Sequence, residues 1–194
     1  MKWYKYDIKD LSDTEYEKWY SLMSEDKKRR VDSFKLIDDK KRTVAGEMLA
    51  RNSIAEWCAV PPESLSFGIG EHGKPYVKSL AVEFNVSHCD NMVVCAVCDT
   101  PVGIDIQRIK PVNLKIAKRI CNDKELETLF GYTPTDKDFI YCENEEMLKR
   151  FFCLWTEKEA CVKYTGNGLA DIKKPNMKSA ENCFFEDYCV SVIY

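Results

Sequence analysis

The sequence lacks long apolar runs. Its N-terminal stretch, MKWYKYDIKD, contains no apolar segment of signal-peptide length, and no part of the chain approaches the roughly 18 apolar residues of a membrane-spanning helix. These absences argue against secretion and against insertion into a bilayer. We therefore predict a cytoplasmic protein with no membrane partner.

The sequence also lacks an excess of basic residues. It has 29 Lys and Arg against 32 Asp and Glu, which gives a net charge of -3 and a pI near 5.6. General nucleic-acid-binding proteins neutralise several phosphates with a clear excess of positive charge. We therefore expect no nucleic-acid partner, and any phosphate site must be local. Fixed-period repeats and low-complexity segments are absent as well.

Cysteine, in contrast, is plentiful. Many of the ten cysteines lie inside apolar runs, where a free Cys behaves as a small buried hydrophobic residue. Cys95 and Cys98 form a C-x-x-C pair, but no second pair follows at zinc-finger spacing. We predict free thiols and neither a zinc site nor a redox motif at that pair.

The apolar fraction of 45% is enough for a substantial core, and the length of 194 residues fits one large domain or two small ones. Helices are predicted at residues 13–22, from residue 24, at 38–59, 111–119, 122–130 and 151–164. Strands are predicted at 3–8, 66–69, 75–77, 81–88, 92–98, 102–107 and 183–194, with a hairpin turn at 99–101. The segment 131–146 has the composition of a loop.

The predicted strand at residues 102–107 alternates. Its apolar residues share one face, while Gly103, Asp105 and Gln107 share the other. The preceding strand, MVVCAVC, is apolar throughout, as expected of a buried strand. Asp105 is therefore an acidic side chain in apolar surroundings, with Gln107 beside it.

The stretch FFCLWTEKEACVKYTGNGL at residues 151–169 is predicted to begin as a helix and to end at Gly166 and Gly168. Phe151, Glu159 and Lys163 lie on one row of that helix. A solvated Glu–Lys pair four residues apart is one interpretation. The apolar neighbours favour a second, in which a covered carboxylate requires a cation or a metal beside it.

A basic cluster occupies residues 27–42, with Lys27, Arg30 and Arg42 among its members. It is either the solvated face of a helix or a phosphate-binding patch in an otherwise acidic protein.

Four short motifs follow one another along the chain, and together they resemble the motifs of a known enzyme family. They are Gly73-Lys74-Pro75, Asn85-Val86-Ser87-His88, Val102-Gly103-Ile104-Asp105-Ile106 and Trp155-x-x-Lys158-Glu159-Ala160-x-x-Lys163. The set resembles the motifs of the surfactin-type 4'-phosphopantetheinyl transferases. The resemblance implies an α+β fold with two similar halves, 1–100 and 101–194. Each half would pack a small antiparallel sheet on a long helix, and the active site would lie between them.

The resemblance further implies an activity, that of a holo-[acyl-carrier-protein] synthase. Such enzymes move the phosphopantetheine arm of coenzyme A onto a serine of an apo acyl or peptidyl carrier protein and release adenosine 3',5'-bisphosphate. Mg²⁺ is the expected metal, because a divalent ion neutralises and orients the attacked diphosphate. The resemblance also implies a monomer, since both halves lie in one chain.

The metal ligands implied by the resemblance are Asp105 and Glu159, with Gln107 at a position that is acidic in many relatives. A neutral amide offers a carbonyl oxygen but no charge, so we expect weaker metal binding and activity with Mn²⁺ as well. Lys163 would stabilise the phosphate in the transition state, and Lys158 would contact a phosphate. Glu125 is either the base that accepts the serine proton, a role that Glu159 or a metal-bound water can also fill, or part of a capping box with Asn122.

Coenzyme A contacts are implied for a further set of residues, namely Lys27, Arg30, Arg42, Thr43, Lys74, Ser87 and His88. Asp105, Lys158 and Lys163 would also face the bound cofactor. A lone His is more often structural, but the match of its motif favours a phosphate contact for His88.

Two other functions compete with this one. Gln107 raises the possibility of a relative that binds coenzyme A without transferring its arm. The basic cluster at residues 27–42 indicates a second alternative, an anion-binding or nucleic-acid-binding module.

Overall fold

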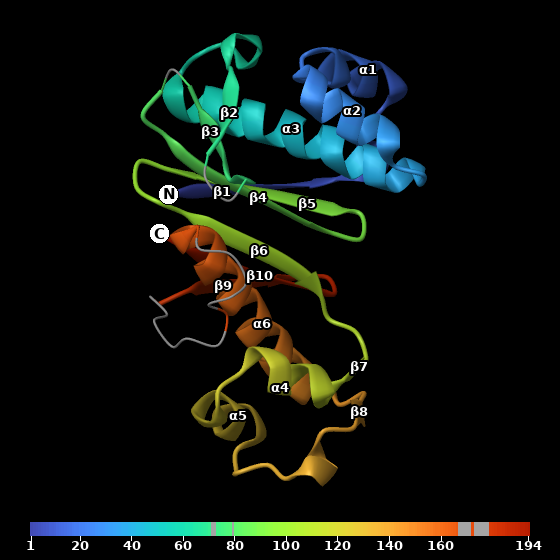
Figure 1. Ribbon diagram of the computed structural model, residues 1–194, viewed down its shortest axis with the longest axis vertical. Helices are drawn as coiled ribbons and strands as arrows, with labels where there is room; N and C mark the ends of the chain where they lie inside the picture. Colours follow the sequence, from blue (N-terminus) through green and yellow to red (C-terminus); the bar gives the residue numbers. More distant parts are fainter. Residues whose placement is uncertain (71–72, 79, 167–171, 173–178) are drawn as a thin grey trace.

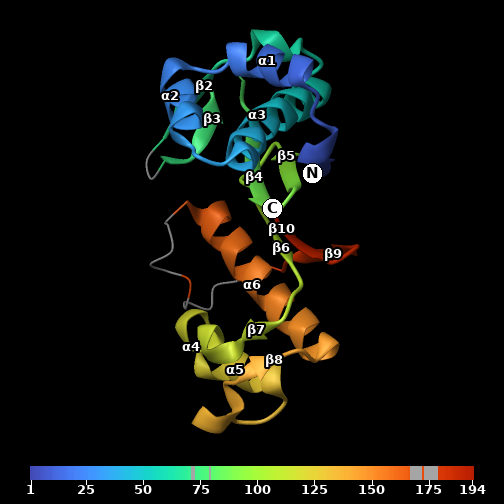
Figure 2. The same cartoon turned by 90° about the vertical axis from the view of Figure 1, so that its right-hand side faces the viewer.

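The computed structural model describes residues 1–70, 73–78, 80–166, 172 and 179–194. Two halves are stacked along the long axis, each with one long helix packed on a small antiparallel sheet, and both chain ends lie near the middle (Figures 1 and 2). In the described residues, no helix combines the length and the apolar character that crossing a membrane requires. In this part of the chain, which includes all ten cysteines, no cysteine forms a disulfide.

The N-terminal half is built around α3, Ile37–Cys58. Its other elements are β1 Lys2–Asp7, α1 Asp13–Ser21, α2 Glu25–Ser33, β2 Phe67–Ile69, β3 Pro75–Val77, β4 Glu83–Cys89 and β5 Met92–Cys98. The main sheet has the order β1-β5-β4, and β2 pairs with β3 in a separate hairpin. The apolar face of α3 covers this sheet and forms the first core.

The C-terminal half is built around α6, Glu145–Thr165. Its other elements are β6 Gly103–Arg108, β7 Val112–Asn113, α4 Ala117–Ile120, α5 Asp123–Phe130, β8 Tyr141–Cys142, β9 Glu181–Phe185 and β10 Tyr188–Ile193. The main sheet has the order β6-β10-β9, and a second core lies between α4, α5 and α6.

The two main sheets share one topology. In each, the first strand of the half pairs antiparallel with the last strand, which in turn pairs with the strand just before it in the chain. This arrangement confirms the predicted α+β fold, with a small antiparallel sheet on a long helix in each half.

Local capping interactions account for several helix boundaries. Ser12 and Glu15 form a capping box that begins α1, as Asn122 and Glu125 do for α5. At the end of α6, Gly166 has a φ of 71°, a left-handed conformation that glycine adopts without strain. Helix α6 begins at Glu145, six residues before the predicted start at 151. Gly168, also predicted at its end, lies outside the described residues.

Two predicted elements are wrong. The turn at 99–101 does not close a hairpin, because β5 already has β4 and β1 on its two edges and β6 pairs with β10 instead. The predicted helix at 111–119 is interrupted as well. Val112 and Asn113 form β7 by pairing with β8, so the helical segment α4 starts only at Ala117, after a 3-10 turn.

A third apolar core lies between the two halves. The side chains of β5 point alternately into the first core and into this third one. Val93, Cys95 and Val97 pack into the first core, while Val94 and Ala96 turn the other way, toward β6 and β10. The predicted burial of this apolar strand is confirmed, since each of its seven residues is buried. The two halves are therefore joined by apolar packing across β5.

Helix α6 approaches β6 closely at Gly103. A Cβ atom at this position would lie 2.0 Å from the carbonyl oxygen of Ala160 and 2.6 Å from the backbone nitrogen of Tyr164. Backbone atoms cannot move aside as a flexible side chain can. Only glycine fits at this position, and the last turns of α6 are thereby brought against β6.

We predict that Gly103→Ala destabilises the protein by about 3 kcal/mol or more, because the added methyl group forces the helix off the strand. Urea denaturation measures the change. Gly46→Ala is the matched control, since its Cβ would meet Val86 at 3.5 Å, an ordinary contact inside a helix. That substitution should stabilise by about 0.5–1 kcal/mol. Equal effects of the two substitutions would contradict the close approach.

Candidate active site between the two halves

Strands β4 and β6 lie side by side where the halves meet, and side chains, not a backbone ladder, join them. The Ile104 amide donates to Asn85 Oδ1 at 3.0 Å, and the Arg108 amide donates to Cys89 Sγ at 3.3 Å. Between these two bonds, Ser87 Oγ donates to Asp105 Oδ1 at 2.7 Å. Alternate residues of β4 therefore face the other half, as the period of a strand requires.

Asp105 is the centre of this junction. Its carboxylate is buried, and Lys163 Nζ donates to Oδ1 at 2.7 Å and to Ser87 Oγ at 2.8 Å. Gln107 Nε2 donates to the second oxygen, Oδ2, at 3.2 Å. Strands from both halves and the end of α6 thus converge on one carboxylate. The predicted common face of Asp105 and Gln107 is confirmed.

Glu159 adds a second carboxylate to the junction. It is half-buried, and burial followed by the nearby charge of Asp105 raises its pKa, with Lys163 acting in the opposite direction. Repulsion between two acids in a poorly solvated place is relieved by a shared cation. The covered-carboxylate interpretation of Glu159 is therefore supported over a solvated surface pair.

Positive groups from both halves surround His88, at the end of β4. Although the His88 side chain reaches solvent, desolvation by its neighbours lowers its pKa. The charges of Arg42, Lys163 and Arg30 lower it further. The charges of basic residues from both halves therefore act at one place, near the end of β4.

Arg42 and Thr43 lie near the beginning of α3. Arg42 donates to the Asp90 carbonyl at 2.8 Å and forms an ion pair with Asp39, while Thr43 Oγ1 donates to the Asp39 carbonyl at 2.9 Å. The hydrogen bond from Arg42 to Asp90 ties the beginning of α3 to the turn between β4 and β5, and the other two contacts lie within α3.

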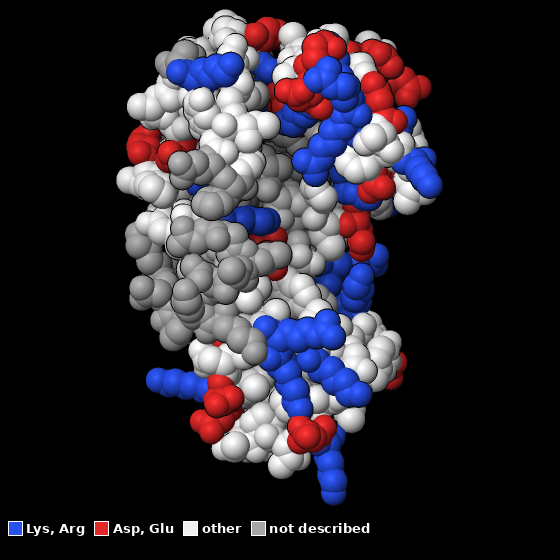
Figure 3. Space-filling view, in the orientation of Figure 1, with Lys and Arg blue, Asp and Glu red and all other residues white. Residues whose placement is uncertain are grey.

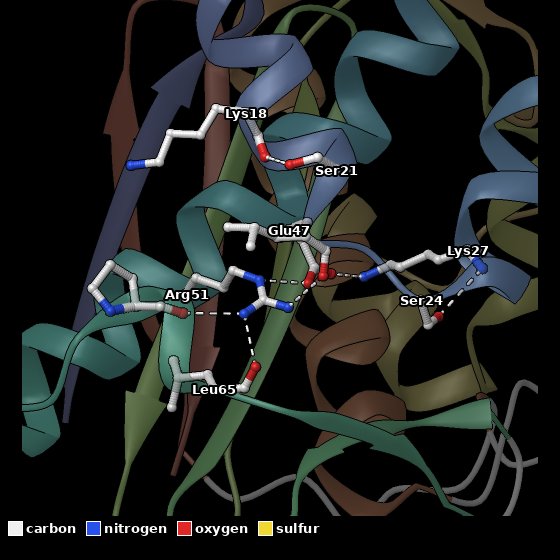
Figure 4. A network of polar contacts seen from close by, with 9 residues as sticks. Lys18, Ser21, Ser24, Lys27, Glu47, Arg51 and Leu65 are labelled. Atoms are coloured by element: carbon white, nitrogen blue, oxygen red, sulfur yellow. Dashed lines mark hydrogen bonds and ion pairs between the residues drawn. The ribbon is translucent and has the colours of Figure 1, made fainter.

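Lys27 belongs to a buried ionic network that the sequence analysis did not identify (Figure 4). Glu47 is 2% exposed and is paired with Lys27 on one oxygen and with Arg51 Nε, at 2.7 Å, on the other. The remaining guanidinium nitrogens of Arg51 donate to backbone carbonyls of Leu65, Pro62 and Leu22. The i, i+4 spacing of Glu47 and Arg51 resembles an ordinary surface pair, so only their burial reveals the network.

A cavity of about 480 Å³ lies beside this network, and Lys27, Arg30, Gly73 and Pro75 line it. Lys74 sits in the same turn as Gly73 and pairs with Glu83 at 3.6 Å. The basic cluster and the Gly-Lys-Pro motif therefore border one hollow in the N-terminal half.

Lys158 and Glu125 lie elsewhere and bind each other. Lys158 is buried, and its ammonium contacts Glu125 Oε1 at 2.8 Å and donates to the Ile172 carbonyl at 2.6 Å. Glu125 Oε2 accepts from the Asn122 amide at 2.8 Å, which is the capping box. Both carboxylate oxygens of Glu125 therefore already have partners, whether Glu125 acts as the base or only as part of the capping box.

The structure brings together most of the predicted site residues. Asp105, Gln107, Glu159, Lys163 and Ser87 meet at the junction, with His88, Arg30 and Arg42 around it. Lys158 and Glu125 form a separate pair between α5 and α6. Asn85, which fixes β6 through a backbone bond, was recognised only as part of a motif.

Comparison with known families matches the two halves in turn. Residues 10–100 match the model described as 4'-phosphopantetheinyl transferase, N-terminal, and residues 101–188 match that of the 4'-phosphopantetheinyl transferase superfamily. The matched segments adjoin between residues 100 and 101, immediately before β6.

Individual relatives agree with these matches. The chain is 34% identical to a 4'-phosphopantetheinyl transferase of Bacillus subtilis, over 82% of this chain and 67% of the relative. It is 38% identical to the 4'-phosphopantetheinyl transferase psf-1 of Bacillus pumilus, over 77% of this chain and 60% of the relative. The Nostoc transferase HetI is 28% identical over 85% of this chain. The chain thus spans about three fifths to two thirds of the length of the two Bacillus relatives.

Because family models match both halves and the relatives match most of the chain, the protein belongs to the 4'-phosphopantetheinyl transferase family.

Proposed function

We propose that the protein transfers the phosphopantetheine arm of coenzyme A to a serine of an apo carrier protein. One observation carries this proposal. Cations from both halves, including Arg30, Arg42 and Lys163, gather around His88 beside the two carboxylates Asp105 and Glu159. A diphosphate needs such an arrangement, since cations bind its oxygens while paired acids hold a metal against it.

The donor is proposed to bind across the junction. Its diphosphate would face Lys163, Ser87 and His88, and its nucleotide end would extend along Lys27, Arg30 and Arg42 toward the 480 Å³ cavity. The buried partners Glu47 and Arg51 fix Lys27 at the wall of that cavity, so less side-chain entropy is lost when a phosphate binds.

The residues present fit a divalent cation. Asp105, Glu159 and the amide oxygen of Gln107 are oxygen donors, as Mg²⁺ and Mn²⁺ require, and the pKa of Glu159 is raised first by burial and then by the nearby charge of Asp105. When bound, the ion neutralises the diphosphate and favours in-line attack on it. A site with few protein ligands also suits Mg²⁺, which keeps waters and substrate oxygens as its remaining ligands.

The remaining chemistry falls to charged side chains of α6 and α5. Lys163 is proposed to stabilise the negative charge that develops on the attacked phosphate. Glu159, whose pKa is raised chiefly by burial, is better suited to accept the serine proton than Glu125, whose oxygens already bind Lys158 and Asn122. Glu125 is then a positioning residue that acts through Lys158.

The acceptor is proposed to be an acidic carrier protein, as expected for this family. Exposed basic residues gather around α4, among them Lys115, Lys118 and Arg119. In the space-filling view, Lys and Arg side chains gather over the C-terminal half (Figure 3). Positive charge here would steer an acidic partner toward the site even though the whole chain is acidic.

The direct test mixes the protein with apo carrier protein, coenzyme A and Mg²⁺ and follows the intact mass of the carrier. We expect a gain of one phosphopantetheine on the carrier and none on a carrier whose acceptor serine is replaced by alanine. Coenzyme A binding without a mass gain would instead indicate the non-transferring relative, and steep salt-dependent DNA binding with neither would indicate the anion-binding module.

Gln107→Glu should increase the dependence on metal. Without metal, the new carboxylate replaces a hydrogen-bond donor of Asp105 and repels it, so the melting temperature in a chelator should fall. With Mg²⁺, the added charge should increase the thermal shift and lower the metal concentration for half-maximal transfer by several-fold. Gln107→Met, which has neither charge nor ligand oxygen, is the control. An unchanged metal titration in both variants would refute a ligand role for residue 107.

Glu125→Gln should chiefly destabilise the protein, by about 3–5 kcal/mol, because it leaves the buried Lys158 ammonium without its counterion. Glutamine at this position keeps the capping box, so the change isolates the charge. The double variant Glu125→Gln, Lys158→Met should recover much of the lost stability in denaturant titrations. If Glu125 were the base, transfer by the folded single variant would fall by about 10²-fold or more.

A further inference from the structure

Cys153 and Cys189 bring two free thiols together beneath the candidate active site. Cys153 lies on α6 and Cys189 on β10, and their sulfur atoms are 3.7 Å apart, with Cys189 Sγ donating to Cys153 Sγ. A disulfide requires a sulfur–sulfur separation of about 2.05 Å, so the two sulfur atoms would have to move closer together before a disulfide could form.

The two thiols differ in access to solvent. Cys189 is fully buried and also contacts the Thr156 hydroxyl at 3.5 Å. Cys153 is half-buried and lines an open groove of about 720 Å³ between α5 and α6. A small oxidant that enters this groove reaches Cys153 before Cys189.

The surroundings also make the two thiols chemically unequal. The hydrogen bond from Cys189 lowers the pKa of Cys153, and burial followed by the charge of Glu157 opposes this effect without reversing it. The same contact, followed by burial, raises the pKa of Cys189. A thiolate is the reactive form of cysteine, and Cys153 is therefore the more reactive of the two.

We propose that Cys153 and Cys189 are an oxidisable dithiol, in which Cys153 reacts first with a peroxide and Cys189 then closes a disulfide that cross-links α6 to β10. In the first step the Cys153 thiolate attacks hydrogen peroxide, which gives a sulfenic acid and hydroxide. In the second step Cys189 sulfur attacks the sulfenic sulfur, and its proton leaves with the hydroxyl group as water. The two thiols lose two electrons to the peroxide, which is reduced to water.

The position of the cross-link gives it a structural consequence. It would fasten the helix that carries Glu159 and Lys163 to β10, in which Cys189 pairs opposite Gln107 of β6. It also closes a loop from residue 153 to residue 189, which removes entropy from the unfolded chain. Oxidation is therefore expected to stabilise the C-terminal half, and a thiol reductant reverses it.

The experiment treats the full-length protein with hydrogen peroxide, blocks remaining thiols with an alkylating reagent and maps the peptides by mass spectrometry. We expect a Cys153–Cys189 cross-linked peptide, two fewer alkylated cysteines and a melting temperature higher by several degrees, all reversed by dithiothreitol. Cys189→Ser should instead leave Cys153 as a sulfenic acid that a dimedone-type reagent captures, a signature that a purely structural role does not produce.

Cys183→Ser is the matched control, because Cys183 is exposed on β9 and its loss should leave the cross-link intact. The proposal fails if Cys153 and Cys189 are both recovered as alkylated thiols once Cys183 is oxidised, or if either pairs with another cysteine instead. The peptide map of the unmodified protein decides this even if Cys189→Ser does not fold. None of these readouts depends on phosphopantetheine transfer.

Discussion

The buried carboxylate of Asp105 is the constraint on which the site depends. An ionised carboxylate out of water costs several kcal/mol unless donors and a positive charge surround it. Here Ser87 of the N-terminal half and Lys163 of α6 supply them, and Gln107 occupies the remaining oxygen. Lys163 and Gln107 compensate the charge from within the C-terminal half, whereas Ser87 can donate its hydrogen bond only when the two halves are correctly assembled. The same contact that stabilises the junction therefore also assembles the candidate active site.

This assembly rests on two features of shape. The alternation of β4 turns Asn85 and Ser87 toward β6, and the missing side chain of Gly103 lets α6 lie against the same strand. Neither half could form the site alone, since β4 brings the hydroxyl and β6 the carboxylate. Apolar packing across β5 provides the attraction that holds the halves together, and the polar side chains fix their register. The geometry of the proposed metal and donor sites would therefore depend on how the two halves are aligned.

Much of the site was predictable because its residues belong to short motifs on regular elements. The period of β6 placed Asp105 and Gln107 on one face, and the row along α6 placed Glu159 near Lys163. Local patterns failed where pairing partners are distant in sequence. A turn after β5 resembles a hairpin, but both edges of β5 were already occupied, and β7 pairs with a strand almost thirty residues away. The burial of Glu47 with Arg51 was invisible for the same reason, since its causes are contacts with other elements.

Helix α6 shows why spacing alone cannot assign roles to charged residues. Lys158 and Lys163 are five residues apart, which places them about 140° apart around the helix axis. Lys163 therefore faces β6 and Asp105, whereas Lys158 faces α5 and Glu125. One helix thus connects the junction, the buried ion pair and the thiol of Cys153.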